Sequence, residues 1–319
     1  MHTSTEPLLV ADIGGSQIRL AHYGGGRDCR LLERRSTPGE HWSEFSTALL
    51  DAFHCAEQQL GRPASALAIS IAGVVVPESG EVIAARLPGL AGRSLAGSLQ
   101  ALLQRPVAVH NDADCAALAE ARLGAAQGER VVFGAVLGTG VGGGLVVDGR
   151  LVIGAGGLCG EWGHGPFLSE ALVRAGDGRK VRLPRWDCGC GQSGCLDTLG
   201  GARGLERLHA LLHPRADGSR ADSWQILAAW QAGEPEAQAT LAVYLDRVAA
   251  GLALVVNTTG ASAVPLSGGL AQCTALVEAL DQAVRQRILR RSSAPLLRQA
   301  QLGEEAGLIG AALALQGAA

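Results

Sequence analysis

The chain has 319 residues, which is long for one hydrophobic core, so we expect two domains with a cleft between them. Its net charge of -3 gives no reason to expect a nucleic acid or an anionic membrane surface as a partner. No stretch looks long enough to span a membrane, and the N-terminus lacks the layout of a signal peptide. Many glycines and alanines and few aromatics are typical of a compact α/β protein, which we expect in the cytoplasm.

The first predicted strands enclose a glycine turn. An apolar run at 8–11 predicts a buried strand, and residues 18–21 alternate like a second strand. Between them lies a hairpin that contains Asp12, Gly14, Gly15 and Ser16. An acid, two glycines and a hydroxyl can bring backbone N–H groups and a carboxylate close to a phosphate–Mg²⁺ group. The alternative is an ordinary Gly-Gly turn in which Asp12 is only a turn-former.

Alternating helices and strands follow. We expect a helix over 41–60, a strand over 67–71 that runs into Ala72-Gly73, a loop over 80–92, a helix over 95–103 and a strand over 106–110.

That last strand delivers two acids to the start of a helix expected over 115–123. A carboxylate at such a junction can cap the helix or sit favourably in its dipole, and it can also act as a general base. Asp114 adjoins the helix and fits the cap, so Asp112 is the candidate base. Asn111 can hold a hydroxyl as both donor and acceptor.

A second glycine loop follows a strand expected over 131–136, and its residues include Gly138, Thr139, Gly140 and Gly142. The spacing of Gly138, Gly140 and Gly143 matches a dinucleotide fingerprint, which requires a helix next. Here Asp148-Gly149 separates two β-rich runs instead, which is a hairpin signal. The loop can still cradle phosphate, but it is not a Rossmann turn.

Three of the eight cysteines are grouped: Cys188, Cys190 and Cys195. Without an export signal, metal binding is a better interpretation than disulfides. Frequent glycines let three thiolates converge, and His164 would supply a fourth ligand from upstream. Three cysteines and one histidine make a closed tetrahedral zinc site, which is structural and leaves no position for the water of a hydrolase. A buried or redox pair is the alternative.

Two carboxylates adjoin the predicted metal site. Glu161 and His164 lie on a glycine-flanked tight turn, and Asp197 lies two residues beyond the last cysteine. Both acids are placed to bind a polar ligand. The hydroxyls of a sugar call for such groups, because each unpaired buried polar group costs about 1–3 kcal/mol.

The rest of the chain is mainly helical, with helices expected over 204–212, 223–232, 235–257, 276–289 and 303–315. A strand over 263–267 ends in Gly268-Gly269, which permits close approach of a flat ligand such as adenine, or simply a turn into a helix. The pattern of strand, glycine hairpin and strand near residue 8 recurs near residue 131, which suggests a duplication.

Together these motifs resemble the ROK (repressor, open reading frame, kinase) family over nearly the whole chain. The motifs, in order, are Asp12-Ile-Gly-Gly-Ser, Asn111-Asp112, Gly138-Thr-Gly-Val-Gly-Gly-Gly, Gly160-Glu-Trp-Gly-His164 and Cys188-Gly-Cys-Gly-Gln-Ser-Gly-Cys195. The resemblance implies an actin-like ATPase fold of two ribonuclease-H-like domains with an interdomain cleft and a structural zinc loop. The small domain would comprise residues 1–110, joined by a C-terminal helix at 304–319, and residues 111–303 would carry the zinc loop and a dimerisation surface.

The resemblance also implies roles for the residues. Asp112 would deprotonate the 6-hydroxyl of a hexose, and Mg²⁺ and ATP would be bound by the Asp12 hairpin, the Gly138 loop and Gly268-Gly269. The sugar hydroxyls would be bound by Asn111, Glu161, His164, Asp197 and Gly73. Zn²⁺ would be held by His164, Cys188, Cys190 and Cys195. A homodimer is implied as well.

Within the family, the approach to the cysteines at 182–188 most resembles bacterial members that phosphorylate N-acetyl-D-glucosamine. Glucose, fructose, mannose and N-acetylmannosamine are the alternative substrates. The family also contains sugar-sensing repressors, but the first strand begins near Leu8, which leaves no room ahead of it for a helix-turn-helix module. A pure sensor would not need Asp112 either.

The chain departs from the family pattern at four places. The family usually has Glu at Asp197, Thr-Lys at Ser16-Gln17, Pro-Gly at Ala72-Gly73 and Asn at Arg86. Asp197 and Arg86 belong to the expected sugar pocket, so they bear on which hexose is bound.

Overall fold

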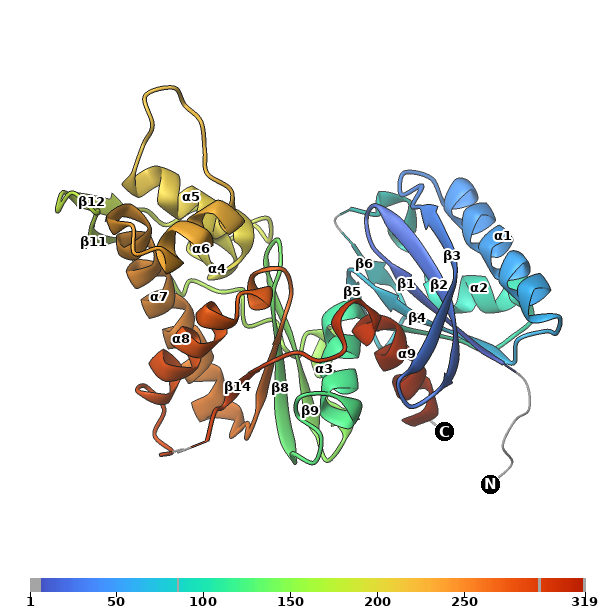
Figure 1. Ribbon diagram of the computed structural model, residues 1–319. Coiled ribbons are helices and arrows are strands. Elements are labelled where there is room, and N and C mark those ends of the chain that lie inside the picture. The colour runs from blue at the N-terminus through green and yellow to red at the C-terminus, as the bar shows by residue number, and fades with distance from the viewer. Residues whose placement is uncertain (1–6, 85, 292–293, 318–319) are drawn as a thin grey trace. The chain divides into compact units, whose positions relative to one another are not determined.

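The computed structural model describes residues 7–84, 86–291 and 294–317. The chain forms two compact units (Figure 1). The first comprises residues 1–127, 144–159 and 302–319, and the second comprises 128–143 and 160–301. The predicted domains were 1–110 with the C-terminal helix at 304–319, and 111–303. In the structure the helix after residue 111 and the segment 144–159 also belong to the first unit.

The first sheet has the strand order β3-β2-β1-β4-β7. Its strands are β1 (Leu8–Ile13), β2 (Gln17–Gly25), β3 (Asp28–Ser36), β4 (Ala66–Ile71) and β7 (Val107–Asn111). β1, β2 and β3 pair antiparallel, whereas β4 is parallel to both β1 and β7. The register places Asp12 opposite Arg19 on one side and Ser70 on the other.

Among its described residues, the first unit is completed by four α-helices: α1 (Trp42–Leu60), α2 (Leu95–Leu103), α3 (Asp112–Leu123) and α9 (Ala306–Gly317). Leu9 and Ile13 share one core with Phe45 and Leu49 of α1, whose apolar residues recur at helical spacing. Strand residues alternate between faces, so Asp12 points to the other face, where Gly307 of α9 approaches it. The shorter elements are β5 (Val74–Val75), β6 (Val82–Ile83), η1 (Pro88–Leu90), β10 (Arg150–Leu151), η2 (Ala155–Gly157) and η4 (Gly303–Glu305).

The second sheet has the order β10-β9-β8-β13-β14. Its further strands are β8 (Val131–Leu137), β9 (Val141–Val147), β13 (Val264–Ser267) and β14 (Leu297–Gln299). β9 and β10 pair antiparallel, and β13 is parallel to both β8 and β14. Both sheets therefore place three successive strands beside two parallel ones, which agrees with the duplication seen in the sequence.

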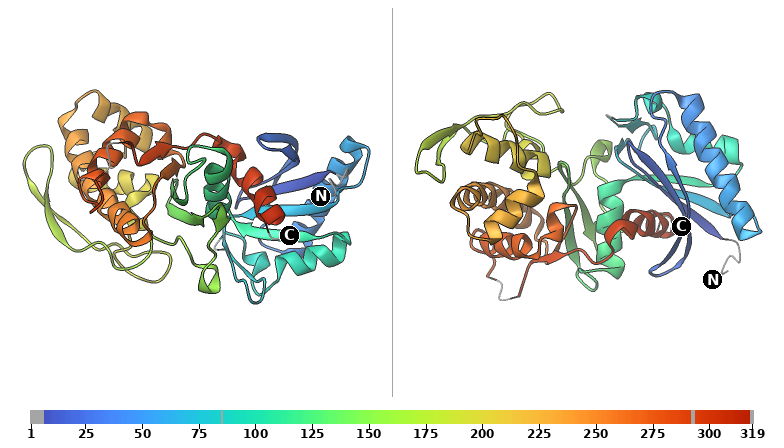
Figure 2. Two further views of the ribbon diagram at one scale, coloured as in Figure 1. Left: turned by 90° about the horizontal axis from the view of Figure 1, so that it is seen from below. Right: turned by 45° about the horizontal axis from the view of Figure 1, so that its top comes forward.

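The helices of the second unit gather in one group (Figures 1 and 2). They are α4 (Asp197–Gly200), α5 (Ala202–Leu212), α6 (Ser223–Gln231), α7 (Pro235–Thr259) and α8 (Thr274–Arg285). A hairpin of β11 (Ala171–Arg174) and β12 (Lys180–Leu183) and a short η3 (Leu270–Gln272) complete the unit.

Helix α7 corrects one expectation. Within the described residues it is long and apolar enough to cross a membrane, although no such segment was expected from the sequence. Half of its most apolar stretch is buried in the protein, and the helix packs against α5, α6 and α8. Packing inside the second unit accounts for its apolar character.

Other elements differ at their ends. The segment 80–92, expected to be a loop, contains β6 and η1. Helix α8 ends at Arg285, four residues before the predicted end at 289. The turn at Asp148 and Gly149, with φ of 50° and 71°, is confirmed as the hairpin that excludes a Rossmann turn.

Candidate functional site

The glycine turn after β1 is held by a residue that the sequence did not single out. The N–H of Gly14 donates to the carbonyl of Gln17 at 2.9 Å, which closes the turn. Thr37 then fixes both sides, because its N–H donates to the Ser16 carbonyl at 3.0 Å and its hydroxyl to the Gly14 carbonyl at 2.8 Å. Ser16 and Gln17 remain exposed at the tip. No sequence signal marks Thr37, since it follows an edge strand about 20 residues downstream.

Asp12 is tied to its sheet neighbours. Its Oδ2 accepts from Arg19 at 2.7 Å and its Oδ1 accepts from the Ser70 hydroxyl at 2.9 Å. Arg19 also donates to the backbone carbonyl of Glu304 at 2.8 Å, at the approach to α9. The carboxylate is thus fixed in orientation, and its charge is partly compensated before any cation binds.

The start of α3 differs from the prediction. Asn111, and not Asp114, is the N-cap: its Oδ1 accepts from the N–H groups of Ala113 at 2.8 Å and Asp114 at 3.1 Å. The helix begins three residues earlier than expected, so Asp114 lies in the first turn and is only 4% exposed. A cap must precede the first helical residue, which excludes Asp114 from that role.

Asp112 is the first residue of α3 and is exposed. Its Oδ1 accepts from the N–H of Ala113 at 2.9 Å, and the helix dipole favours a carboxylate at this end. Asn111 beside it donates through Nδ2 to the Gly73 carbonyl at 3.0 Å. The first unit therefore holds Asp112, Asn111 and Gly73 together.

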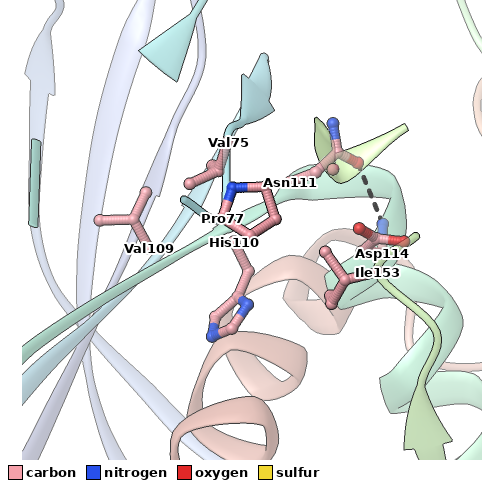
Figure 3. A pocket seen from close by; sticks show the side chains of 8 residues that line it. Val75, Pro77, Val109, His110, Asn111, Asp114 and Ile153 are labelled. Atoms are coloured by element: carbon pink, nitrogen blue, oxygen red, sulfur yellow. Dashed lines mark hydrogen bonds between the residues drawn. The ribbon is translucent and has the colours of Figure 1, made fainter. Parts of the chain in front are cut away.

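A cavity of about 150 Å³ lies beside Asn111 in the first unit (Figure 3). Its polar side chains come from His110, Asn111 and Asp114, and its remaining lining residues are Val75, Pro77, Val109, Ile153 and Gly157. The imidazole of His110 points away from the Asn111 amide (Figure 3), as successive strand residues do. Burial lowers the pKa of His110, so this side chain is neutral near pH 7.

In the second unit, the glycine loop and Gly268 meet. The N–H of Gly138 donates to the Gly140 carbonyl at 3.0 Å, and the N–H of Ala202 donates to the Gly138 carbonyl at 2.8 Å. Gly268 has φ of 92°, and a Cβ placed on it would lie 2.7 Å from the Gly138 nitrogen, so only glycine fits. These nucleotide-site candidates, which lie about 130 residues apart, are thus brought together.

Asp197 links the glycine loop to the cysteines. Its Oδ1 accepts from the N–H of Val141 at 2.7 Å, just after the loop, and its own N–H donates to the Gly163 carbonyl at 2.9 Å. Its Oδ2 lies 3.9 Å from the Cys188 sulfur. One carboxylate oxygen of Asp197 is therefore engaged by the backbone, which the sequence did not reveal.

Glu161 and His164 lie on a turn, as predicted. The N–H of His164 donates to the Glu161 carbonyl at 3.1 Å, and the His164 Nε2 lies 3.7 Å from a Glu161 carboxylate oxygen. Trp162, between them, donates from its indole to the Gly142 carbonyl at 2.7 Å and packs edge-on against Phe133. The indole therefore anchors the turn to β9.

The predicted metal ligands converge. His164, Cys188, Cys190 and Cys195 place one ligand atom each within 4.8 Å of one another. The Cys190 and Cys195 sulfurs are 3.6 Å apart, and the Cys188 sulfur is 3.6 Å from the His164 Nδ1. Tetrahedral Zn²⁺ with bonds of about 2.3 Å to sulfur and about 2.05 Å to nitrogen requires separations of about 3.8 Å and about 3.6 Å. The donor set therefore fits this ion.

Two thiols of the cluster have pKa values shifted in opposite directions. The backbone N–H of Gln192 lowers the pKa of the Cys190 thiol to about 7, whereas burial raises the pKa of Cys188 to about 12. A bound cation favours the thiolate form of both. With Nδ1 directed to the cluster, the Nε2 of His164 faces Glu161, the arrangement by which a carboxylate orients a metal-ligating imidazole.

Comparison with known proteins decides the family. Residues 9–317 match the model of the ROK family. The chain belongs to this family. The ROK chain is 36% identical to N-acetylgalactosamine kinase AgaK of Shewanella sp. (strain ANA-3), over 95% of this chain and 94% of that protein. It is 33% identical to an N-acetyl-D-glucosamine kinase of Pectobacterium carotovorum subsp. carotovorum (strain PC1), over 95% and 96%.

Solved structures agree with this assignment. A ROK hexokinase from Thermus thermophilus superposes with a TM-score of 0.79 at 34% identity, over 98% of this chain and 99% of that one. A ROK glucokinase from Streptomyces griseus, solved with glucose and AMPPNP, gives 0.74 at 27% identity over 98% and 100%. The fold of this ROK chain is therefore an α/β fold of the actin-like ATPase type.

Proposed function

We propose that this ROK protein is an ATP-dependent sugar kinase that phosphorylates the 6-hydroxyl of N-acetyl-D-glucosamine. The observation that carries the proposal is the match, over nearly the full chain, to proteins named as kinases of N-acetylated hexosamines. The exposed carboxylate of Asp112, at the start of α3, supplies the base that such a reaction requires.

In the proposed reaction, Asp112 accepts the proton of the sugar 6-hydroxyl as the hydroxyl oxygen attacks the γ-phosphorus of ATP. The bond from this phosphorus to the β,γ-bridging oxygen breaks, and ADP leaves. Phosphoryl transfer needs little covalent work from the protein, so positioning and charge neutralisation govern the rate. The helix dipole and the Ala113 N–H keep the Asp112 carboxylate oriented.

The proposed sugar ligands come from both units. Asn111 retains one amide hydrogen beyond its bond to the Gly73 carbonyl, whereas its Oδ1 already accepts two N–H groups of α3. Glu161, His164 and Asp197 would bind the remaining hydroxyls. Since Oδ1 of Asp197 already accepts a backbone N–H, its Oδ2 is the oxygen left for the sugar.

The proposed nucleotide ligands also come from both units. In the first unit, Asp12 and the turn over 14–16 would face the Mg²⁺–phosphate group. In the second, the backbone of Gly138, Thr139, Gly140 and Gly142 would cradle phosphate, with Gly268 and Gly269 against the adenine. Glycine at these positions permits the close approach that such contacts need.

A structural Zn²⁺ is proposed at His164, Cys188, Cys190 and Cys195. When bound, it supplies a rigid cross-link between the turn that carries Glu161 and the loop before Asp197. The four protein donors leave no open position, so we assign the ion no part in phosphoryl transfer. A homodimer in the cytoplasm completes the proposal.

N-acetyl-D-galactosamine is the second candidate substrate, because the relative with 36% identity is named for it. The two sugars differ only in the orientation of the 4-hydroxyl. A buried polar group without a partner costs about 1–3 kcal/mol, which is enough for one site to distinguish them by roughly 5- to 150-fold.

A coupled assay of ADP release tests the proposal across a panel of hexoses. The panel contains both N-acetylhexosamines, N-acetylmannosamine, glucose, fructose and mannose. The highest kcat/KM is expected for N-acetyl-D-glucosamine. Sugar binding without turnover on every member would contradict a kinase and favour a sensor.

A further inference from the structure

The Arg86 side chain covers the glycine turn of the first unit. A Cβ placed on Gly15 would lie 2.8 Å from the Cβ of Arg86 and 2.9 Å from its Cδ, so the aliphatic stem runs directly over this glycine. Both residues belong to the first unit, and Arg86 is exposed. Its guanidinium therefore lies near the tip of the turn formed by Gly14 to Gln17.

The backbone that follows Arg86 is packed into the first unit. Leu87 is 1% exposed and belongs to the core of the first unit. The carbonyl of Arg86 packs on Gly39, where a Cβ would lie 2.9 Å away, and the Gly39 carbonyl accepts from the N–H of Gly89 at 2.8 Å. The side chain thus extends toward the turn from a carbonyl and a following residue that are packed in the first unit.

Arg86 is also a cation that remains available at this turn. Residue 17, at its tip, is the neutral Gln17. Arg19 is engaged by Asp12 and by both the side chain and the backbone of Glu304. Among the residues that the structure describes, Arg86 forms no hydrogen bond or ion pair. Its five donors are therefore free to bind an anion.

We propose that Arg86 binds the phosphates of Mg·ATP and supplies the positive charge of this turn. A planar guanidinium suits a phosphate because it donates two parallel hydrogen bonds. The inference rests on the proposed function, and it removes Arg86 from the sugar contacts that the family pattern implies for this position. Arg86 thereby compensates for the neutral Gln17.

Binding of ATP to the full-length protein tests this role without turnover. Isothermal titration with Mg·ATP in the absence of sugar is expected to show a dissociation constant about tenfold higher for Arg86→Asn, the loss of one charge-assisted contact. Adenosine, which has no phosphate, should bind the variant and the wild type equally. Arg86→Lys should recover part of the affinity.

The matched control is Arg62→Asn. Arg62 precedes β4, whose start lies at the edge of the sheet opposite the glycine turn, because β4 is parallel to β1. This variant removes the same charge and is expected to leave the ATP affinity within twofold of the wild type.

Steady-state kinetics distinguishes an effect of Arg86 on ATP from an effect on the sugar. Arg86→Asn should raise the KM for ATP and leave the KM for the sugar within twofold. A raised sugar KM with unchanged ATP binding would overturn the assignment and place Arg86 at the sugar. If the wild type binds ATP but phosphorylates no sugar, the kinase proposal fails while the ATP titrations still decide the role of Arg86.

Discussion

Asn111 has a structural role as the N-cap of α3 and a proposed role in sugar binding, and two substitutions can separate these roles. Asn111→Ala removes two hydrogen bonds accepted from the helix and one donated to the Gly73 carbonyl. Loss of an N-cap costs about 1 kcal/mol, and an ordinary hydrogen bond contributes about 1 kcal/mol. The free energy of unfolding should therefore fall by about 2 kcal/mol. Asn111→Ser keeps a capping hydroxyl and loses only the Gly73 contact, so it should cost about 1 kcal/mol.

Urea denaturation followed by circular dichroism measures the free energy of unfolding of both variants. The dependence of this free energy on urea concentration is compared as well, to ensure that the same transition is observed. The sugar KM of both variants should rise, since both lack the amide. Equal stability losses in the two variants, or a loss below about 0.5 kcal/mol for Asn111→Ala, would refute the capping argument.

Three further predictions concern the second unit and pH. Cys195→Ser should lower the amount of zinc bound to the purified protein, measured by mass spectrometry, and should lower the midpoint of thermal unfolding. An unchanged zinc content would show that Cys195 is not a ligand. Burial lowers the pKa of His209, His213 and His110, so the unfolded state binds more protons below about pH 6.5 and stability should fall as pH decreases through that value. Urea titrations at pH 7.5 and 5.5 measure this fall in the free energy of unfolding. The fall should be smaller for His209→Gln than for the wild type, and an equal fall would contradict this account. Tyr244→Phe removes the bond from a fully buried hydroxyl to the Gly200 carbonyl at 2.7 Å, which should cost about 1–3 kcal/mol in chemical denaturation, and no change would show that this carbonyl finds another donor.

Local sequence signals made much of the secondary structure predictable. Helix α2 and the Asp148-Gly149 hairpin carry clear local signals, and both form as expected. Strand β3 was missed because its side chains are mostly polar and lie at the sheet edge, where no apolar alternation is required. The predicted start of α3 was wrong because Asn111, Asp112 and Asp114 all have side chains that can cap a helix, and only the backbone decides between them.

Some features of the candidate site were also predictable from the sequence, and others were not. The four predicted metal ligands converge because glycines allow the loop to fold back on the His164 turn. Contacts across the sheet were not visible in the sequence: Arg19 is bound to Asp12 through strand register, and Thr37, just after β3, holds the glycine turn. Such partners depend on which strands pair, and no local pattern encodes that.

The central claim is that Asp112 acts as the base in the phosphorylation of a sugar 6-hydroxyl, and Asp112→Asn tests it most directly. Turnover of N-acetyl-D-glucosamine should fall at least 100-fold in the coupled ADP assay, the low end of general-base contributions. Sugar affinity, measured by titration, should stay within a few-fold, and phosphorus NMR of the wild-type product should place the phosphate on O6. Near-wild-type turnover of Asp112→Asn, or a phosphate on another oxygen, would contradict the account.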